Sequence, residues 1–324
     1  GRKWSSLDGN SNLDDLFRNR SPEWIVRQAE RFYLSLGWPS LPRSFWEKSD
    51  LYPAPASANR VKSLTPLVLN IDLDRDVRAL MNVTPNFHWF EVSHNMLGQA
   101  YYTLAYATPR VPPVLREGAN RAFSQAVGNL MAIAARQEPY LRTIGLLDGN
   151  RKVDQNQWLL AEALEGAVVR LPWSAGTMAH FEHDLYERRL TSSRFNRYWW
   201  SLAARYQGLQ PPAVRGEEYC DACNDPGLVD QPARSYDFAL AAIITYHLHD
   251  YISRQILHQD PHLCNYYGNR EVGRWLWEIL SLGATRDWRQ VIREKTGEEI
   301  SSRALVEYFR PLLSYLREVN KTAR

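Results

Sequence analysis

The sequence predicts a mainly α-helical fold with a minor β component, and three observations support this prediction. Hydrophobic residues make up 44% and aromatic residues 12% of the 324 residues, enough apolar surface for a substantial core. Apolar residues recur at helical spacing through most of the chain, whereas strand-like alternation is confined to residues 65–74. No linker divides the sequence. We therefore expect residues 1–324 to form a single domain.

The N-terminal elements follow from capping signals and periodicity. Ser21 is a good N-cap, Pro22 suits the first helical position, and the apolar pattern that follows stops at Gly37. Proline-rich loops come next, then the strand-like alternation of residues 65–74. Two strong helical patterns complete this half, at 88–106 and 117–137.

The C-terminal half is predicted to consist of further helices. A loop over residues 209–234, rich in proline and glycine, interrupts them. The helices are expected at 156–173, 176–190, 192–208, 236–259, 269–283, 287–297 and 302–320.

Composition excludes several classes of protein. The net charge is +3 and the basic residues are scattered, so no stripe indicates nucleic-acid binding. No apolar run approaches the ~20 residues that a membrane span needs. Cys220 and Cys223 form a single CxxC, which argues against a zinc ribbon and leaves a local disulfide or two free thiols as alternatives. The third cysteine is Cys264.

The stretch VSHNMLGQAYY, residues 92–102, resembles a zinc-peptidase helix that lacks the metal ligands and the catalytic glutamate. Such a helix needs two histidines at i and i+4, with a glutamate after the first. Here those two positions hold Asn95 and Gln99, and the position after the first holds Met96. His94 lies one residue out of register, about 100° round the helix from the ligand direction.

Five collinear stretches carry a wider resemblance. They are RFYLSLGWPSLPRSFWEKS, LREGANRAFSQAVGNL, YWWSLAARYQGLQPP, NREVGRW and SRALVEYFRPLLSYLREVN. Together they make the chain similar to the peptidyl-dipeptidase A family, the angiotensin-converting-enzyme-like zinc peptidases, from about Trp24 to the C-terminus. The match is to the C-terminal half of a family domain, without the family's N-terminal helices. The resemblance implies a zincin-like helical fold with a deep central channel.

In this family the metal is held by two histidines of one helix and a glutamate of the next, and a glutamate acts as general base. The resemblance places Asn95, Gln99 and Gln125 at the ligand positions and Met96 at the base. Asn129 falls where the family has an acid that orients a ligand. Neutral amides are poor zinc donors, so we expect no zinc and no cofactor here. The amides are also expected to hydrogen-bond to one another.

Further positions implied by the resemblance differ as well. Phe238 replaces the tyrosine that stabilises an oxyanion, and Asp237 replaces a chloride-binding arginine. A histidine of the preceding loop corresponds to Leu228, and the loop that lines the cleft includes Pro55 and Ala56. The family's disulfide positions fall at Ala54 and Asn82 and near Ser253, with Cys264 alone kept.

Three further pairs of histidines are candidate metal ligands. The pairs are His180 with His183, His247 with His249, and His258 with His262. None combines i,i+4 spacing with a base, so surface or core histidines are the simpler interpretation. Glycosylation sequons begin at Asn82 and Asn320, as expected by chance in a chain of this length.

The resulting hypothesis is a catalytically inactive pseudo-peptidase kept as a binding or structural subunit of a larger protein assembly. Its expected partner is another protein chain, one that completes the N-terminal half, or a peptide. The alternatives are an active peptidyl dipeptidase or carboxypeptidase with a non-standard site, and a peptide-binding module. The resemblance suggests an extracellular or membrane-associated location, while the missing disulfides leave an organelle or the cytoplasm open.

Overall fold

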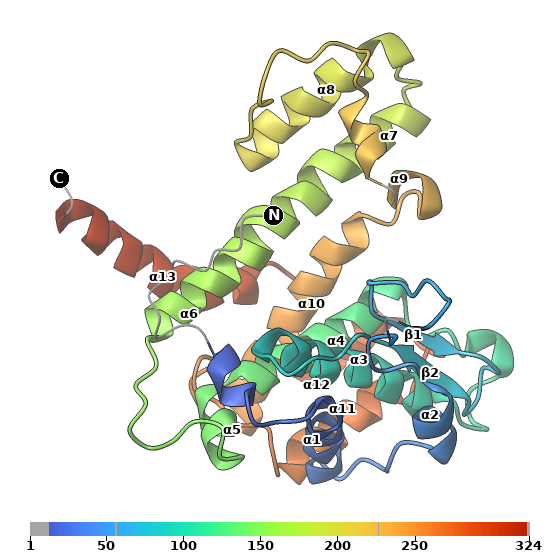
Figure 1. Ribbon diagram of the computed structural model, residues 1–324, viewed down its shortest axis with the longest axis vertical. Coiled ribbons are helices and arrows are strands. Elements are labelled where there is room, and N and C mark those ends of the chain that lie inside the picture. Colours follow the sequence, from blue (N-terminus) through green and yellow to red (C-terminus); the bar gives the residue numbers. More distant parts are fainter. Residues whose placement is uncertain (1–12, 56, 226, 323–324) are drawn as a thin grey trace. The chain divides into compact units, whose positions relative to one another are not determined.

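The computed structural model describes residues 13–55, 57–225 and 227–322, and it divides the chain into two compact units (Figure 1). The first comprises the described residues up to Gln155 together with Ile244–Tyr308. The second comprises Asn156–Ile243 and the described residues from Phe309 onward. Most described residues are helical and two short strands form the only sheet among them, so the predicted mainly α fold with minor β is confirmed.

The first unit is built from helices around a β-hairpin. Short 3₁₀ turns are η1 (Asp14–Phe17) and η2 (Pro113–Leu115), and η8 (Ile252–Ile256) is π-helical. Two helices, α10 and α13, have residues in both units. The other elements are α1 (Pro22–Ser35), α2 (Arg43–Lys48), β1 (Leu67–Asn70), β2 (Val77–Leu80), α3 (Phe87–Tyr106), α4 (Arg121–Arg136), α5 (Glu138–Thr143), α10 (Tyr236–Tyr251), α11 (Arg270–Leu280), α12 (Trp288–Thr296) and α13 (Arg303–Thr322).

Helices α3 and α4 pack closely against each other in the centre of this unit (Figure 1). Their starts are fixed by Asn86 and Asn120, whose side chains accept hydrogen bonds from the backbone N–H three residues on. The close approach depends on glycine, because a Cβ on Gly98 would lie 3.3 Å from Gly128 Cα. Tyr33 of α1 closes the packing by donating a hydrogen bond to the His94 carbonyl of α3.

The hairpin pairs β1 with β2 antiparallel, with Leu67 opposite Leu80. The predicted strand at 65–74 is therefore confirmed only over Leu67–Asn70. The chain turns after Asn70 because Asp72 Oδ1 accepts hydrogen bonds from the backbone N–H groups of Asp74 and Asp76. The second strand, β2, has only four residues, too few for strand alternation to stand out in the sequence.

The second unit contains α6, α7, α8 and α9 with π-helical and 3₁₀ segments between them. Its core contains Met178, Phe181 and Leu202, with Ala222 and Leu228 packed beside them. The elements are α6 (Gln155–Glu162), η3 (Ala163–Arg170), η4 (Pro172–Met178), α7 (Ala179–Tyr186), η5 (Ser192–Arg194), α8 (Phe195–Leu202), η6 (Ala203–Gln207), η7 (Asp221–Asn224) and α9 (Gly227–Asp230).

Two helices predicted at 156–173 and 176–190 are instead one continuous helical run over residues 155–186. The predicted gap between them, residues 174–175, follows Pro172, and a proline inside an α-helix lacks an N–H and clashes with the carbonyl four residues before it. The segments around Pro172 are π-helical, and the wider turns relieve this clash.

Cys220 and Cys223 form a disulfide, which decides between the two alternatives left by the sequence. Cys264 is buried as a free thiol, and burial raises its pKa to about 12. Among the described residues, no helix combines the length and apolar character that a membrane crossing requires.

Candidate functional site

The four amide side chains singled out in the sequence lie on the facing helices α3 and α4. Asn95 and Gln99 are one turn apart on α3, and Gln125 and Asn129 are one turn apart on α4. All four are partly buried. The two asparagine N-caps fix where each helix begins and therefore which face these side chains occupy.

Three of the four amides form a linked network. Asn95 Nδ2 donates a hydrogen bond to Asn129 Oδ1 at 3.0 Å, and Gln99 Nε2 donates to Asn95 Oδ1 at 2.8 Å. The expected mutual hydrogen bonding is thus present for these residues. Gln125 is outside the network, since its side chain has no hydrogen bond to any described residue.

The space occupied by Asn95 exists because residue 128 is glycine. A Cβ built on Gly128 would lie 2.4 Å from Asn95 Oδ1 and 2.9 Å from the Asn95 backbone oxygen. Any side chain at 128 would therefore displace Asn95 or separate the helices.

The neighbours of Asn95 on α3 have other surroundings. Met96 is buried, and its thioether has no basic group to accept a proton from water. His94 is fully buried, with Nδ1 2.8 Å from the Phe90 carbonyl and Nε2 3.1 Å from the Tyr140 hydroxyl. Burial lowers the pKa of His94 to about 4, so its ring is neutral at pH 7. His94 is therefore a core residue of the first unit.

The remaining predicted positions lie elsewhere in the chain. Phe238, Asp237 and Leu228 belong to the second unit, where the Phe238 ring lies 5.8 Å from Trp173. Leu228 is part of that unit's core and Asp237 is buried. In the first unit Pro55 is exposed, while Ala56 lies outside the described residues.

Within the described ranges, no three His, Cys, Asp or Glu side chains are grouped so that they could hold an ion. The candidate histidines contact other residues. His180 stacks on Tyr206, and His249 contacts the Tyr266 hydroxyl. His262 contacts the Tyr308 carbonyl.

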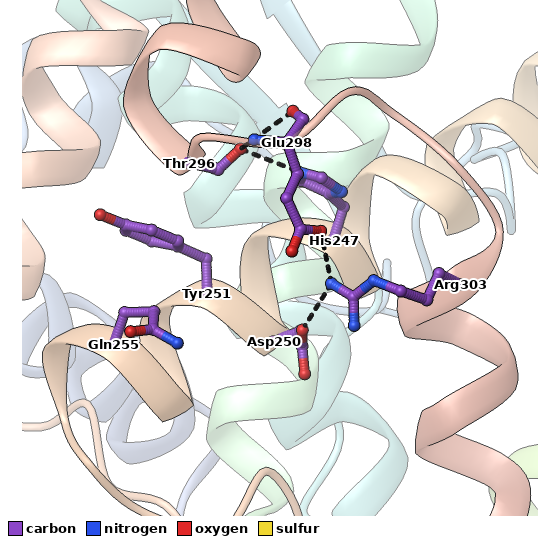
Figure 2. Close-up of a pocket in the computed structure, with 7 residues that line it drawn as sticks. All are labelled: His247, Asp250, Tyr251, Gln255, Thr296, Glu298 and Arg303. Atoms are coloured by element: carbon purple, nitrogen blue, oxygen red, sulfur yellow. Dashed lines mark hydrogen bonds and ion pairs between the residues drawn. The ribbon is translucent and has the colours of Figure 1, made fainter.

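Sequence reasoning missed a polar pocket of about 140 Å³ where α10, η8, the end of α12 and the start of α13 meet (Figure 2). Arg303 Nη2 bridges Asp250 Oδ2 at 3.1 Å and Glu298 Oε2 at 2.6 Å. His247 Nε2 lies 3.0 Å from Thr296 Oγ1, and burial lowers the pKa of His247. Because Arg303 is paired with both Asp250 and Glu298, these ion pairs link the segments that line the pocket. Only proximity in three dimensions reveals it.

A second pocket, of about 470 Å³, lies within the second unit between α7 and α8. At its wall the Asp184 carboxylate accepts a hydrogen bond from the Tyr198 hydroxyl at 2.5 Å and contacts His183 Nδ1 at 3.0 Å. The hydrogen bond from Tyr198 lowers the pKa of Asp184, and burial raises the pKa of Tyr198 to about 12. The i,i+3 spacing of His180 and His183 was the sequence signal for this region.

Comparison with known proteins identifies the family. A family model described as angiotensin-converting enzyme, a peptidase family, matches residues 10–324. The chain belongs to the angiotensin-converting enzyme family. It is 29% identical over 304 residues to angiotensin-converting enzyme of Sus scrofa, a match that covers 91% of this chain and 22% of that protein.

Two other relatives match the chain with the same identity and over the same share of its length. Angiotensin-converting enzyme-like protein Ace3 of Mus musculus is 29% identical over 302 residues, covering 91% of this chain and 40% of the relative. Angiotensin-converting enzyme-related protein of Drosophila melanogaster is 29% identical over 308 residues, covering 91% and 47%. The chain thus spans less than half the length of these relatives, and the family resemblance read from the sequence is confirmed.

Proposed function

We propose that this member of the angiotensin-converting enzyme family is a pseudo-peptidase, inactive toward peptides and retained for binding or structure. The supporting observation is the hydrogen-bonded set Asn95, Gln99 and Asn129 on the facing helices α3 and α4. The family resemblance places a metal ligand at the first two of these positions and at Gln125.

The chemistry of this set supports the proposal. A zinc peptidase needs imidazole or carboxylate ligands and a base that takes a proton from the metal-bound water. Asn95, Gln99 and Gln125 offer only neutral amides, and Met96 stands at the position of the base. The amide hydrogen bonds of Asn95 are already used within the protein, so coordination of an ion would break them.

Restoring the ligand set tests the assignment of these positions. The variant Asn95→His, Met96→Glu, Gln99→His, Gln125→Glu is expected to bind about one zinc per chain, measured by elemental analysis after dialysis. The unmodified protein is expected to bind none and to leave peptide substrates uncleaved. Failure of the fourfold variant to take up zinc while it remains folded would contradict the assignment.

A matched control uses the contact between Asn95 and Gly128. Adding Gly128→Ala to the fourfold variant would push the side chain at position 95 out of the space between the helices. Zinc binding should then fall, while Gly166→Ala, where an added Cβ meets nothing within 4 Å, should leave zinc binding unchanged. Equal binding in both controls would mean that residue 95 is not a ligand position.

We further propose that the protein acts as a subunit beside another polypeptide, which covers apolar side chains of the second unit. In that unit Val168 and Val169 are about half exposed, and Val214 and Val229 more so. Apolar groups in water are stabilised when a partner covers them.

Native mass spectrometry of protein from its source tests this proposal. A metal-free complex with a further chain is the expected result and would identify the partner. A monomer carrying one zinc and cleaving peptides would instead favour an active peptidase. A metal-free monomer that binds peptides would favour a peptide-binding module.

A further inference from the structure

The disulfide between Cys220 and Cys223 closes a turn in the loop that follows α8 and η6. The two residues inside this turn, Asp221 and Ala222, point to different surroundings. Ala222 is fully buried in the core of the second unit, beside Met178 and Leu202. The disulfide therefore encloses the point at which the loop enters the core.

Asp221 is the polar anchor of the same turn. Its carboxylate accepts hydrogen bonds from Trp200 Nε1 at 2.8 Å and from Arg215 Nε and Nη2 at 2.7 and 2.6 Å. These donors, with Arg215 the strongest influence, lower the pKa of Asp221 to about 2. The carboxylate is thus charged at neutral pH and holds the loop against α8.

Asn196 at the start of α8 provides the second attachment. Its side chain is fully buried, accepts a hydrogen bond from the Asp221 backbone N–H at 2.9 Å, and donates to the Gly216 carbonyl at 2.8 Å. The backbone N–H of Asn196 in turn donates to Glu217 at 2.7 Å. The loop segment 215–223 is therefore attached to α8 both before the disulfide turn and within it.

The bond itself is placed where a thiol can reach it. Cys223 is exposed to solvent, whereas Cys264 is buried. A disulfide constrains the unfolded chain less when its loop is short, so this bond across three residues adds little to stability through loop closure. Cys220 also has a left-handed backbone, with φ of 38°, a conformation that residues with a side chain rarely adopt.

We propose that Cys220 and Cys223 form a thiol–disulfide exchange site for low-molecular-weight thiols of the glutathione class, and that its redox state determines how firmly segment 215–223 is held on α8. The thiolate of the small thiol attacks Cys223 Sγ, which forms a mixed disulfide and releases Cys220 as a thiolate that takes a proton from water. A second small thiolate attacks the sulfur of the bound thiol, which releases the small disulfide and the Cys223 thiolate. The protein disulfide gains two electrons, and two small thiols are oxidised to one disulfide.

The exchange is tested by equilibrating the folded protein in glutathione buffers of stepped ratio. Samples are quenched with acid, unfolded, alkylated and weighed by mass spectrometry. The pair 220/223 is expected to pass from oxidised to reduced within the buffer series, while Cys264 adds one alkyl group in every sample and so serves as an internal count. A pair that stays oxidised in the most reducing buffer, or stays reduced in the most oxidising one, would overturn the proposal.

The control of the loop is tested by limited trypsin digestion of the oxidised and reduced protein. Cleavage after Arg215 is expected to become several-fold faster on reduction, whereas cleavage after Arg189, which lies outside the loop in the same unit, keeps its rate. The double variant Cys220→Ser, Cys223→Ser should show the faster rate in both buffers. Equal rates after Arg215 in the oxidised and reduced wild-type protein would contradict the proposed effect on the loop.

Discussion

The polar clusters on α3–α4 and on α7–α8 are built from different types of residue. Between α3 and α4 three neutral amides satisfy one another in a space that glycine provides. Between α7 and α8 a carboxylate, Asp184, gathers a tyrosine hydroxyl, an imidazole and the Arg188 guanidinium beside a pocket of about 470 Å³. The first cluster is neutral and closely packed, whereas the second is charged and open.

The difference is one of charge: the amide network on α3–α4 contains no charged side chain, whereas the cluster on α7–α8 is centred on a carboxylate. Neutral amides need only geometry, so tight packing stabilises them. A carboxylate needs donors or water, so it is placed beside a pocket. Substitutions in the amide network should therefore act mainly through packing, whereas substitutions around Asp184 should change the pKa of its carboxyl group.

The largest effect is expected where α3 and α4 approach most closely. Gly128→Ala places a Cβ 2.9 Å from the Asn95 backbone oxygen, which cannot move without separating the helices. We expect the free energy of unfolding to fall by about 3 kcal/mol, measured by urea denaturation. The matched variant Gly166→Ala lies in η3, where an added Cβ meets nothing within 4 Å. It should be neutral or slightly stabilising, and a loss as large as that of Gly128→Ala would remove the packing difference between the two regions.

Lowering the pH should reduce the free energy of unfolding through protonation of His94, which lies beside the amide network on α3. Its pKa in the folded protein is about 4, below the ordinary value of 6.5, so the unfolded chain takes up the proton first as the pH falls. The stabilisation is complete above about pH 6.5 and decreases toward pH 4, by about 3 kcal/mol in total. Denaturation at pH 7 and pH 4.5 measures it, and His94→Gln should flatten the dependence. The same pH slope in both proteins would show that His94 is not responsible.

In the charged region, Tyr198→Phe removes the main donor to Asp184. We expect a loss of about 1.5 kcal/mol, as for a hydrogen bond to a charged group. The pKa of Asp184 should rise, since the Tyr198 hydrogen bond is the leading cause of its lowered value. Carboxyl NMR titration measures this rise directly, and an unchanged pKa would contradict the contact.

The smallest effects on stability are expected for substitutions at Asn129, within the amide network, and at Gln125, outside it. Asn129→Ala leaves Asn95 Nδ2 without its acceptor and should cost about 1 kcal/mol, with no pH dependence between pH 5 and pH 8. Gln125→Ala should cost less than about 0.5 kcal/mol because that side chain has no hydrogen bond to a described residue. If the two variants were equally destabilised in urea, the network would extend to Gln125.

Sequence patterns predicted the long helices well because local signals determine them. Ser21 caps α1 as expected, and α3 begins one residue before the predicted 88–106. Short elements such as α2 and β2 carry too few residues for a period to appear. The run through Pro172 was predicted as two helices because the π-helical turns that accommodate proline have no sequence signature.

The candidate site was predictable in part. The i,i+4 spacing of Asn95 and Gln99 already brings them together, whereas the pairing with Asn129 depends on the contact between α3 and α4. In the pocket at Arg303, the contact between Arg303 and Asp250 joins residues 53 positions apart, so no local pattern contains it.

The glycine contact between α3 and α4 also has a consequence for the order of folding. Only residues 107–120 separate the two helices, so their pairing closes a short loop. The contact of Thr245 in α10 with the Ala126 carbonyl of α4 spans 119 residues and has to wait for a much larger closure. We therefore expect the α3–α4 pair to belong to the folding nucleus, so that Gly128→Ala slows refolding more than it speeds unfolding.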